Sequence, residues 1–219
     1  MVIYRRFIQN GKIEIPSMVI APDNSRGAAI FIHGYGGSKE EQLGFAWRIA
    51  ETGLTAIAID LRGHGENPLS MDEGIVSDLG AVIAYGKGYG KVATIGHSLG
   101  GRLALLSDAD FAIAVSPALN QEFSESTQSI LRNKRSYRVR ESFPDANFEI
   151  LRKLPLWKPD SKEAMILYGT RDVPEIIQSC QNLKIIGVRT NEIDQALHSD
   201  TFLIEPTFRK VIDQFREWY

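Results

Sequence analysis

Gly96-His97-Ser98-Leu99-Gly100-Gly101 is the stretch that decides how this chain is interpreted, because of what lies on either side of it. A short, apolar, partly β-branched run precedes it, Lys91–Ile95 (KVATI), which predicts a buried strand. The residues that follow the serine, Leu99–Ser107 (LGGRLALLS), have the composition of a helix. A turn between strand and helix with glycines on both sides of Ser98 can be sharp enough to push its hydroxyl out of the backbone. That hydroxyl would lie at a helix N-terminus, where free N–H groups favour developing negative charge.

Composition indicates an ordinary globular protein with one core. The chain has 219 residues, of which 43% are hydrophobic and 24% charged. A formal net charge of -2 argues against a general nucleic-acid binder, which needs a basic surplus. The single cysteine, Cys180, excludes an intrachain disulfide framework and a multi-cysteine zinc site, and we expect it to be buried on a helix.

No cofactor and no membrane span are predicted. The glycines of Gly86–Gly90 (GKGYG) precede a strand and lack the spacing of a dinucleotide-binding loop, so they indicate a turn. The sequence contains neither a phosphate-binding loop nor paired metal-ligand histidines. The first residues, MVIYRRFIQNGK, lack an apolar signal core, and no run reaches the ~18 apolar residues of a membrane span. We expect a cytoplasmic protein that acts on a small molecule, and the sequence does not predict its oligomeric state.

Strands and helices alternate along most of the chain. Asn10-Gly11 separates two partly alternating segments and predicts a β-hairpin at the start. The strands predicted after it are Gly27–His33, Leu54–Leu61, Lys91–Ile95, Phe111–Val115, Ala164–Tyr168 and Lys184–Val188. The predicted helices are Glu40–Thr52, a helix over Ile75, Val76, Leu79, Val82 and Ile83 with a capping box at Ser70-x-x-Glu73, Leu99–Ser107, Val173–Gln181 and Thr207–Trp218. This order predicts an α/β fold: a mostly parallel sheet covered by helices on both faces.

The pattern changes between residues 121 and 160, where apolar residues become sparse and charges dense. We expect one domain over residues 1–219, with 121–160 forming a small helical cap inserted above Ser98. The aromatic and aliphatic residues spaced to give short amphipathic helices facing the pocket are Phe123, Ile130, Leu131, Tyr137, Phe143, Phe148, Leu154 and Trp157.

A nucleophilic serine needs a base and an orienting acid. Among the four histidines, His198 alone lies in a loop between the last predicted strand and the last helix. His33 and His64 lie in glycine-rich turns after earlier strands, and the sharp turn should point His97 away from the site. The orienting acid has three candidates. Asp172 stands just past a strand, although an aspartate before Val-Pro also suits a helix N-cap. The alternatives closer to His198 in sequence, neither at a strand end, are Asp194 and Asp200.

A second glycine-rich turn, His33–Gly37 (HGYGG), follows the first long buried strand. Its backbone can aim an N–H at the pocket and pair with the N–H of Leu99 to bind an oxyanion. The alternative is a flexible turn that happens to hold small residues.

Five motifs in this order resemble the α/β-hydrolase superfamily, in particular its compact serine esterase and lipase-like members. They are His33–Gly37, Asp60–Gly65 (DLRGHG), Gly96–Gly101, Gly169–Pro174 (GTRDVP) and His198. The resemblance implies Ser98 as nucleophile, Asp172 as acid and His198 as base. It also implies that the backbone N–H groups of Tyr35 and Leu99 form the oxyanion hole.

The function we expect is hydrolysis of carboxylic esters with small to medium acyl groups. Two alternatives stay open: an acyl-thioesterase for anionic substrates of the acyl-CoA kind, and a binding protein that kept the fold without catalysis. The thioesterase alternative depends on a basic strip, the candidate anion-binding residues Arg132, Lys134, Arg135, Arg138 and Arg140. An ordinary solvated helix face, balanced by nearby glutamates, would explain the same strip.

Overall fold

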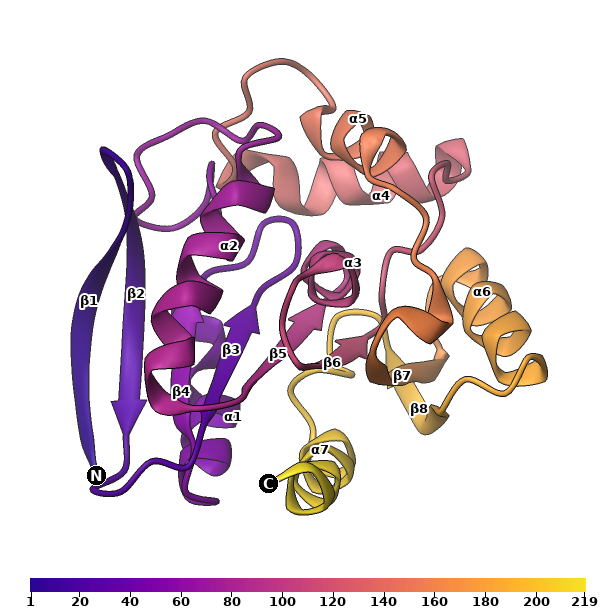
Figure 1. Ribbon diagram of the computed structural model, residues 1–219. Coiled ribbons are helices and arrows are strands. Elements are labelled where there is room, and N and C mark those ends of the chain that lie inside the picture. The colour runs from indigo at the N-terminus through magenta and orange to yellow at the C-terminus, as the bar shows by residue number, and fades with distance from the viewer.

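An eight-stranded sheet forms the centre of the molecule (Figure 1). The computed structural model describes residues 1–219, except for the side chains of Lys134 and Asp160. Across the sheet the strands run in the order β1-β2-β4-β3-β5-β6-β7-β8. Their bounds are β1 Val2–Asn10, β2 Ile13–Ala21, β3 Ala28–Ile32, β4 Thr55–Ile59, β5 Val92–His97, β6 Phe111–Val115, β7 Glu163–Arg171 and β8 Thr190–Leu197.

The predicted N-terminal hairpin is present, and it forms one edge of the sheet. β1 and β2 pair antiparallel from Val2 opposite Ala21 to Asn10 opposite Ile13, with Gly11 in the left-handed region at φ +60°. β2 then pairs antiparallel with β4, whereas every later pair, from β3 with β4 to β7 with β8, is parallel. The sheet is therefore mostly parallel, as predicted.

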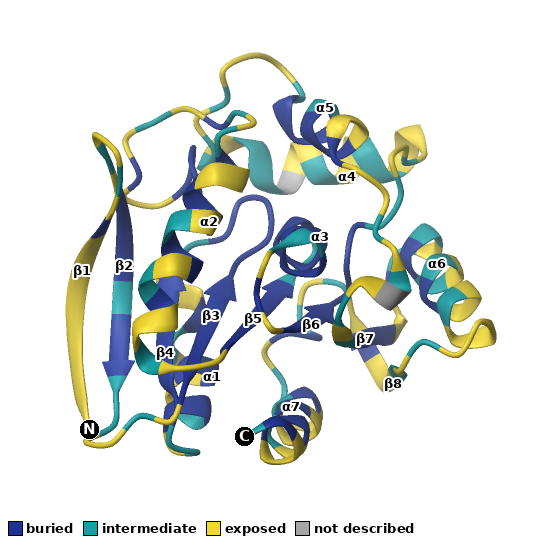
Figure 2. Ribbon diagram, in the orientation of Figure 1, coloured by how far each residue is buried: buried dark blue, intermediate teal, exposed yellow. Residues whose placement is uncertain are grey.

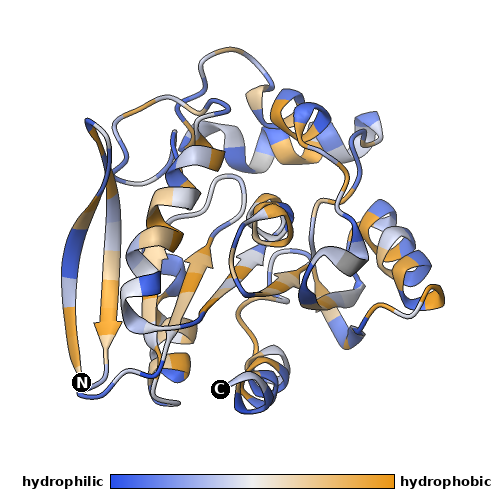
Figure 3. Cartoon of the chain, viewed as in Figure 1, coloured by the Kyte–Doolittle hydropathy of each residue, from blue (hydrophilic) through white to orange (hydrophobic). Residues whose placement is uncertain are grey.

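Helices cover both faces of the sheet, and the strands between them are buried (Figures 1 and 2). The helices are α1 Leu43–Ala50, α2 Ile75–Gly86, α3 Leu99–Leu106, α4 Glu125–Arg135, α5 Ala146–Lys153, α6 Pro174–Ile185 and α7 Glu205–Trp218, with short 3₁₀ turns η1 Lys39–Gln42, η2 Lys87–Tyr89, η3 Ser136–Arg138 and η4 Pro159–Ser161. Side chains alternate across β3: Ile30 packs with α2 and α3, while Phe31 packs with α1 and α7. Burial on both faces explains why the central strands are continuously apolar (Figure 3).

The last predicted strand is wrong. Residues 184–188 are not a strand, because α6 continues to Ile185 and ends before Gly187, which has φ +87°. The true strand is β8, at the edge of the sheet, where only Ile193 and Ala196 are buried. An edge strand with so little buried surface carries no apolar run, while Ile185, 82% exposed, supplied a misleading one.

The predicted capping box is also wrong. α2 begins at Ile75, and the Oδ1 of Asp72 accepts the backbone N–H of Gly74 at 2.8 Å just before the helix. Val76, expected on the inner face, is 50% exposed. The helix starts later than the Ser70-x-x-Glu73 pattern indicated, because the preceding loop continues to Gly74.

The segment between β6 and β7 carries α4 and α5, which lie beyond the carboxyl ends of the parallel strands (Figure 1). Arg102 of α3, only 1% exposed, holds both ends of this segment. Its guanidinium donates to the carbonyl of Leu119 at one end, and to those of Leu154 (3.3 Å) and Pro155 (2.6 Å) at the other. Among the described residues, no helix combines the length and the apolar character that a membrane crossing needs.

Candidate active site

Ser98 stands in a strained turn between β5 and α3. Its backbone has φ 53° and ψ -114°, a region that costs a non-glycine residue roughly 1–3 kcal/mol. The turn closes only because its neighbours are glycines. A Cβ on Gly96 would lie 2.0 Å from the carbonyl oxygen of Gly100, and one on Gly100 would lie 2.2 Å from the carbonyl oxygen of Ile32. The sequence therefore permits the close contact of β5, α3 and β3 that presents the serine hydroxyl.

The structure brings Ser98, His198 and Asp172 together. The Nε2 of His198 lies 3.1 Å from the Oγ of Ser98, and its Nδ1 lies 2.7 Å from the Oδ1 of Asp172. Because a carboxylate only accepts, Nδ1–H is the donor to Asp172, and Nε2 of the neutral ring is left to accept the serine proton. Ser98 and Asp172 follow β5 and β7, and His198 directly follows β8, so the carboxyl ends of three strands supply the three groups.

Asp172 is suited to remain ionised although it is 6% exposed. Burial raises the pKa of its carboxyl. The hydrogen bond and the charge of His198, together with the hydrogen bond from the backbone N–H of Val173, lower it by more, so the pKa is lowered overall. That N–H donates to Oδ1 at 2.7 Å. The N-cap of α6 is Val173, so Asp172 does not cap this helix.

The two alternative acids are engaged elsewhere. Asp200 accepts the backbone N–H of Leu197 at 2.7 Å, and Asp194 lies 3.5 Å from the hydroxyl of Thr170. In the part of the chain that the structure describes, Asp172 is the carboxylate hydrogen-bonded to His198.

His97 does not point away from the site, and that prediction is wrong. Its Nε2–H donates to the backbone carbonyl of His198 at 2.8 Å, and the two rings lie 4.9 Å apart between centroids. His97 is half-buried and lines the cavity. Burial, and after it the neighbouring imidazole of His198, lowers the pKa of His97 to about 3. His97 thus helps to hold the loop of His198, a role that only its place as the last residue of β5 could have suggested.

The glycine-rich turn after β3 lies directly against Ser98. A Cβ on Gly34 would be 3.1 Å from the Cβ of Ser98 and 3.0 Å from the Nδ1 of His97, so a side chain there would crowd both residues. Among the described residues, the N–H of Tyr35 has no protein acceptor, and that of Leu99 is the first of α3, which has no intrahelical acceptor. Both predicted oxyanion donors are therefore uncommitted.

The rings of His33 and His64 form hydrogen bonds with the backbone. The Nδ1–H of His33 donates to the carbonyl of Gly34 at 2.8 Å, while Nε2 accepts the backbone N–H of Leu61 at 3.1 Å. His64 donates from Nδ1 to the carbonyl of Arg62 at 2.8 Å, and the two rings are 4.8 Å apart. The bond from Leu61 to His33 and the packing of the two rings connect the turn that carries Tyr35 to the loop after β4.

A family model for the alpha/beta hydrolase family matches residues 29–182, most of the chain. The chain belongs to the alpha/beta hydrolase family. A search of curated proteins returns no significant match.

Solved structures of hydrolases share this fold at low sequence identity. A structure from a study of carboxylesterases of Nitrososphaera gargenis superposes with a TM-score of 0.72 at 14% identity, over 96% of this chain and 97% of that one. A hyperthermophilic esterase from Pyrobaculum calidifontis gives 0.67 at 20% identity, over 98% and 83%. A thioesterase domain from the curacin biosynthetic pathway gives 0.68 at 17% identity, over 98% and 99%. At these identities the similarity establishes the fold.

A cavity of about 880 Å³ opens beside Ser98 in this hydrolase. Its floor includes the Ser98, His198 and Asp172 group and the glycine-rich turn, and α4 and α5 form part of its wall. Five of the eight apolar residues predicted to face the pocket line it: Phe123, Ile130, Leu131, Tyr137 and Phe148. Phe143, Leu154 and Trp157 are not among the lining residues, and Phe143 instead lines a smaller hollow beside α2.

The basic strip does not act as one surface. Arg132 binds Asp145, with Nη2 2.9 Å from Oδ2, and Arg138 binds Glu41 at 2.6 Å. Arg140 donates to backbone carbonyls of the loop after β4, including that of Gly65 at 3.1 Å. The side chain of Lys134 lies outside the described residues. Arg135, which is half-buried like Arg138, differs from the other arginines because it lines the cavity.

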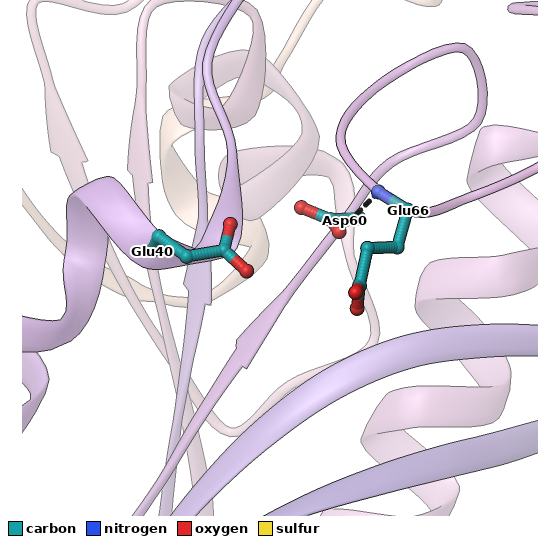
Figure 4. A group of neighbouring side chains, drawn as sticks. All are labelled: Glu40, Asp60 and Glu66. Carbon is teal, nitrogen blue, oxygen red and sulfur yellow. Dashed lines mark hydrogen bonds between the residues drawn. The ribbon is translucent and has the colours of Figure 1, made fainter.

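A cluster of three acidic side chains forms ion pairs with the buried Lys39. Figure 4 shows the carboxylates of Glu40, Asp60 and Glu66 turned toward a shared region. The Nζ of Lys39, 1% exposed, lies 2.7, 2.6 and 2.9 Å from them, so all three of its protons have acceptors. Burial alone would lower the pKa of Lys39, but the carboxylates raise it above its usual range. We assign no metal to this cluster, which braces the turn that carries Tyr35.

Proposed function

We propose that this hydrolase is a serine carboxylesterase for small to medium acyl groups. One observation carries the proposal: an unbroken chain of contacts from the Oγ of Ser98 through His198 to Asp172, at 3.1 and 2.7 Å, on the wall of a largely apolar cavity. Such a chain activates a hydroxyl that is otherwise a weak nucleophile.

The proposed reaction begins when Nε2 of His198 takes the proton of Ser98 as Oγ attacks the acyl carbonyl carbon. The N–H groups of Tyr35 and Leu99 bind the oxyanion of the tetrahedral intermediate. Asp172 stabilises the imidazolium, which then protonates the departing alcohol. Water enters, loses a proton to His198 and releases the acid from the acyl-enzyme, so that Ser98 regains its proton.

We also propose that residues 121–160 act as a cap within a single domain of residues 1–219. Support comes from α4 and α5, whose side chains line the cavity, and from Arg102, which ties both ends of the segment to α3. A cap that excludes water would strengthen every electrostatic interaction at Ser98.

Replacement of the nucleophile tests the proposal. Ser98→Ala should lower turnover of short-chain aryl esters by roughly 10⁴–10⁶-fold without changing the melting temperature greatly. A serine-directed phosphonate should label the wild type and not this variant. Ser77→Ala, an exposed change on α2, serves as the matched control and should retain full activity. If Ser98→Ala kept more than a tenth of the turnover, the serine mechanism would be wrong, and a folded wild type that neither labels nor hydrolyses would be a binding protein.

A thioesterase for anionic substrates is the second candidate, and Arg135 favours it. Among the described residues, this guanidinium has no carboxylate within 4.0 Å, yet it lines the cavity, and an added Cβ on Gly36 of the oxyanion turn would lie 2.7 Å from its Cβ. Arg135→Gln should raise KM for an acyl-CoA thioester by roughly tenfold, as expected for loss of one charged hydrogen bond. KM for a neutral ester should stay constant, and the effect should shrink at high salt. Arg152→Gln, on the outside of α5, is the control. Equal kinetics on both substrates would exclude this role.

A further inference from the structure

Ser116 lies between the nucleophile and the acid at the edge of the sheet where the site forms. It directly follows β6, which pairs with β5 on one side and with β7 on the other. Ser98 follows β5 and Asp172 follows β7, so the carboxyl end of β6 separates the two. The side chain of Ser116 is completely buried there.

The backbone of Ser116 is held in a strained conformation. Its φ is +49°, in the left-handed region, and the ring of Pro117 further narrows the backbone range of the residue before it. Backbone hydrogen bonds hold this turn: the N–H of Ser116 donates to the carbonyl of Leu167 at 2.7 Å, and that of Ala118 donates to the carbonyl of Ser98 at 3.1 Å. Neither bond uses the hydroxyl, and glycine would form both with less strain. The turn itself therefore does not explain why the residue is a serine.

A buried hydroxyl and a buried carboxylate oxygen are both unpaired. Among the described residues, neither the Oγ of Ser116 nor the Oδ2 of Asp172 has a hydrogen-bond partner. The other oxygen of Asp172, Oδ1, accepts from the Nδ1–H of His198 and from the backbone N–H of Val173, both at 2.7 Å. A hydroxyl can donate and a carboxylate oxygen only accepts, so the two unpaired groups are chemically complementary. Buried polar groups are nearly always hydrogen-bonded in folded proteins, so each of these atoms is expected to have a partner.

The hydroxyl of Ser116 already acts on the carboxyl of Asp172. Burial raises the pKa of this carboxyl, and the groups that lower it by more include, after His198, the hydroxyl of Ser116. Rotation about the Cα–Cβ bond moves a serine hydroxyl without moving the backbone. Hydrogen bonds within an active site are often long or poorly aligned in the free enzyme, and they tighten when substrate is bound. The two unpaired groups are therefore neighbours that a side-chain rotation can join.

We propose that Ser116 is a positioning residue for the acid, and that its hydroxyl donates to Oδ2 of Asp172 and so keeps Oδ1 turned toward His198. A carboxylate can rotate about its Cβ–Cγ bond, and a donor on Oδ2 restrains that rotation. The imidazole then keeps the orientation that leaves Nε2 free to take the proton of Ser98. This inference rests on the proposed esterase function and adds a residue that supports its acid.

Removal of the hydroxyl tests the inference. Ser116→Ala should lower kcat for a short-chain aryl ester by roughly tenfold at nearly constant KM, as expected for loss of one hydrogen bond to a charged group. Ser116→Gly should lower kcat as much and should melt at or above the temperature of Ser116→Ala, because glycine relieves the backbone strain. The glycine variant keeps the test valid if the alanine variant folds poorly.

A matched control is available on β2. Ser17 is buried like Ser116, and its hydroxyl donates to the carbonyl of Ile15 at 3.0 Å, away from the cavity lining. Ser17→Ala removes a buried hydroxyl without touching the acid, so it should keep the full kcat.

Two measurements separate positioning from a general loss of structure. In the Asp172→Asn background, Ser116→Ala should change kcat by less than about twofold, because the hydroxyl acts through the carboxylate. In the proton NMR spectrum, the deshielded Nδ1 proton of His198 is identified by its absence from His198→Ala. This signal should move downfield in Ser116→Ala, because a carboxylate with one donor fewer is a stronger acceptor for Nδ1–H.

Unchanged kcat in Ser116→Ala and Ser116→Gly would overturn the inference, as would an additive loss in the Asp172→Asn background or an Nδ1 proton at an unchanged shift. The NMR measurement needs no substrate, so it also separates the two failures. A signal that moves as expected in a protein that does not cleave esters would contradict the esterase proposal alone.

Discussion

Two buried imidazoles should make this fold unstable in mild acid. His33 and His64 are both fully enclosed, and burial lowers the pKa of His33 to about 4 and that of His64 to about 3. Both rings are held neutral: protonation would set the Nε2–H of His33 against the N–H of Leu61, and the Nε2 of His64 is buried without a protein partner. In the unfolded chain each ring has the ordinary pKa of about 6.5.

The sign and size follow from proton binding. The folded pKa lies below the unfolded value, so the unfolded state binds more protons and the free energy of unfolding falls as the pH drops below 6.5. Between pH 7 and pH 5 each imidazole contributes a loss of about 2 kcal/mol, so His33 and His64 together account for about 4 kcal/mol. The half-buried His97, whose pKa is lowered in the same direction, adds to this loss in the wild type and in a His64 variant alike. A loss of that size is a large part of the 5–15 kcal/mol that stabilises ordinary domains.

Urea denaturation followed by tryptophan fluorescence, at constant ionic strength from pH 5 to pH 8, measures the effect. In His64→Asn the amide can still donate to the carbonyl of Arg62, but this side chain takes up no proton. The loss between pH 7 and pH 5 should therefore be about 2 kcal/mol smaller than in the wild type. Between pH 7 and pH 8 both proteins should be constant, which is the internal control. The acidic limit is kept at pH 5, because carboxylates such as Glu66, whose pKa Arg5 and Lys39 lower to about 2, add their own losses further down.

If His64→Asn lost as much stability as the wild type between pH 7 and pH 5, the imidazole would not be held neutral in the folded state. A wild type that lost less than about 1 kcal/mol would contradict the reasoning for both rings.

Three further predictions concern the site and its supports. Asp172→Asn should lower kcat by roughly 10³–10⁴-fold, whereas Asp200→Asn should cost less than about tenfold, and the reverse order would show that the wrong acid has been chosen. His97→Phe should lower kcat about tenfold at nearly constant KM, because the loop of His198 loses its hydrogen bond. His97→Gln can still donate and should recover most of the lost kcat. A change in KM alone would contradict this positioning role. Arg102→Met should reduce the free energy of unfolding by about 3 kcal/mol, since three backbone carbonyls lose their donor, and should speed proteolysis between residues 120 and 155; unchanged protease resistance would mean that the segment is held by other contacts.

Local chemistry explains what could be predicted. The hairpin follows from a glycine that adopts a left-handed turn, and the central strands follow from apolar runs buried on both faces. The turn at Ser98 follows from two glycines whose neighbours leave no space for a Cβ. That Ser98 and Asp172 would meet was predictable because both follow predicted strands, and the carboxyl ends of parallel strands share one edge of the sheet, whereas His198 was predicted from its order in the chain.

Edge position limited the prediction at β8. A strand with one neighbour and one buried face shows only two buried residues, Ile193 and Ala196, so its composition resembles a loop. Its position matters for function, since β8 delivers His198 directly to Asp172 and Ser98. The prediction of His198 did not depend on the correct strand, because chain order before the last helix was enough.

By itself, the sequence determined the fold class, the turn that presents Ser98 and the identity of the groups that meet there, because each depends on residues that are neighbours in the chain or follow a regular strand pattern. Only the tertiary structure decided which side chains have partners. The folded chain pairs Arg132, Arg138 and Arg140 with residues remote from them in sequence. His97 donates a hydrogen bond to the backbone of His198. Among the described residues, the side-chain oxygens of Gln42 and Asn147 are buried without a protein partner. The physical reason is that hydrogen bonding and burial depend on distances between segments remote in sequence, and no local pattern encodes those distances.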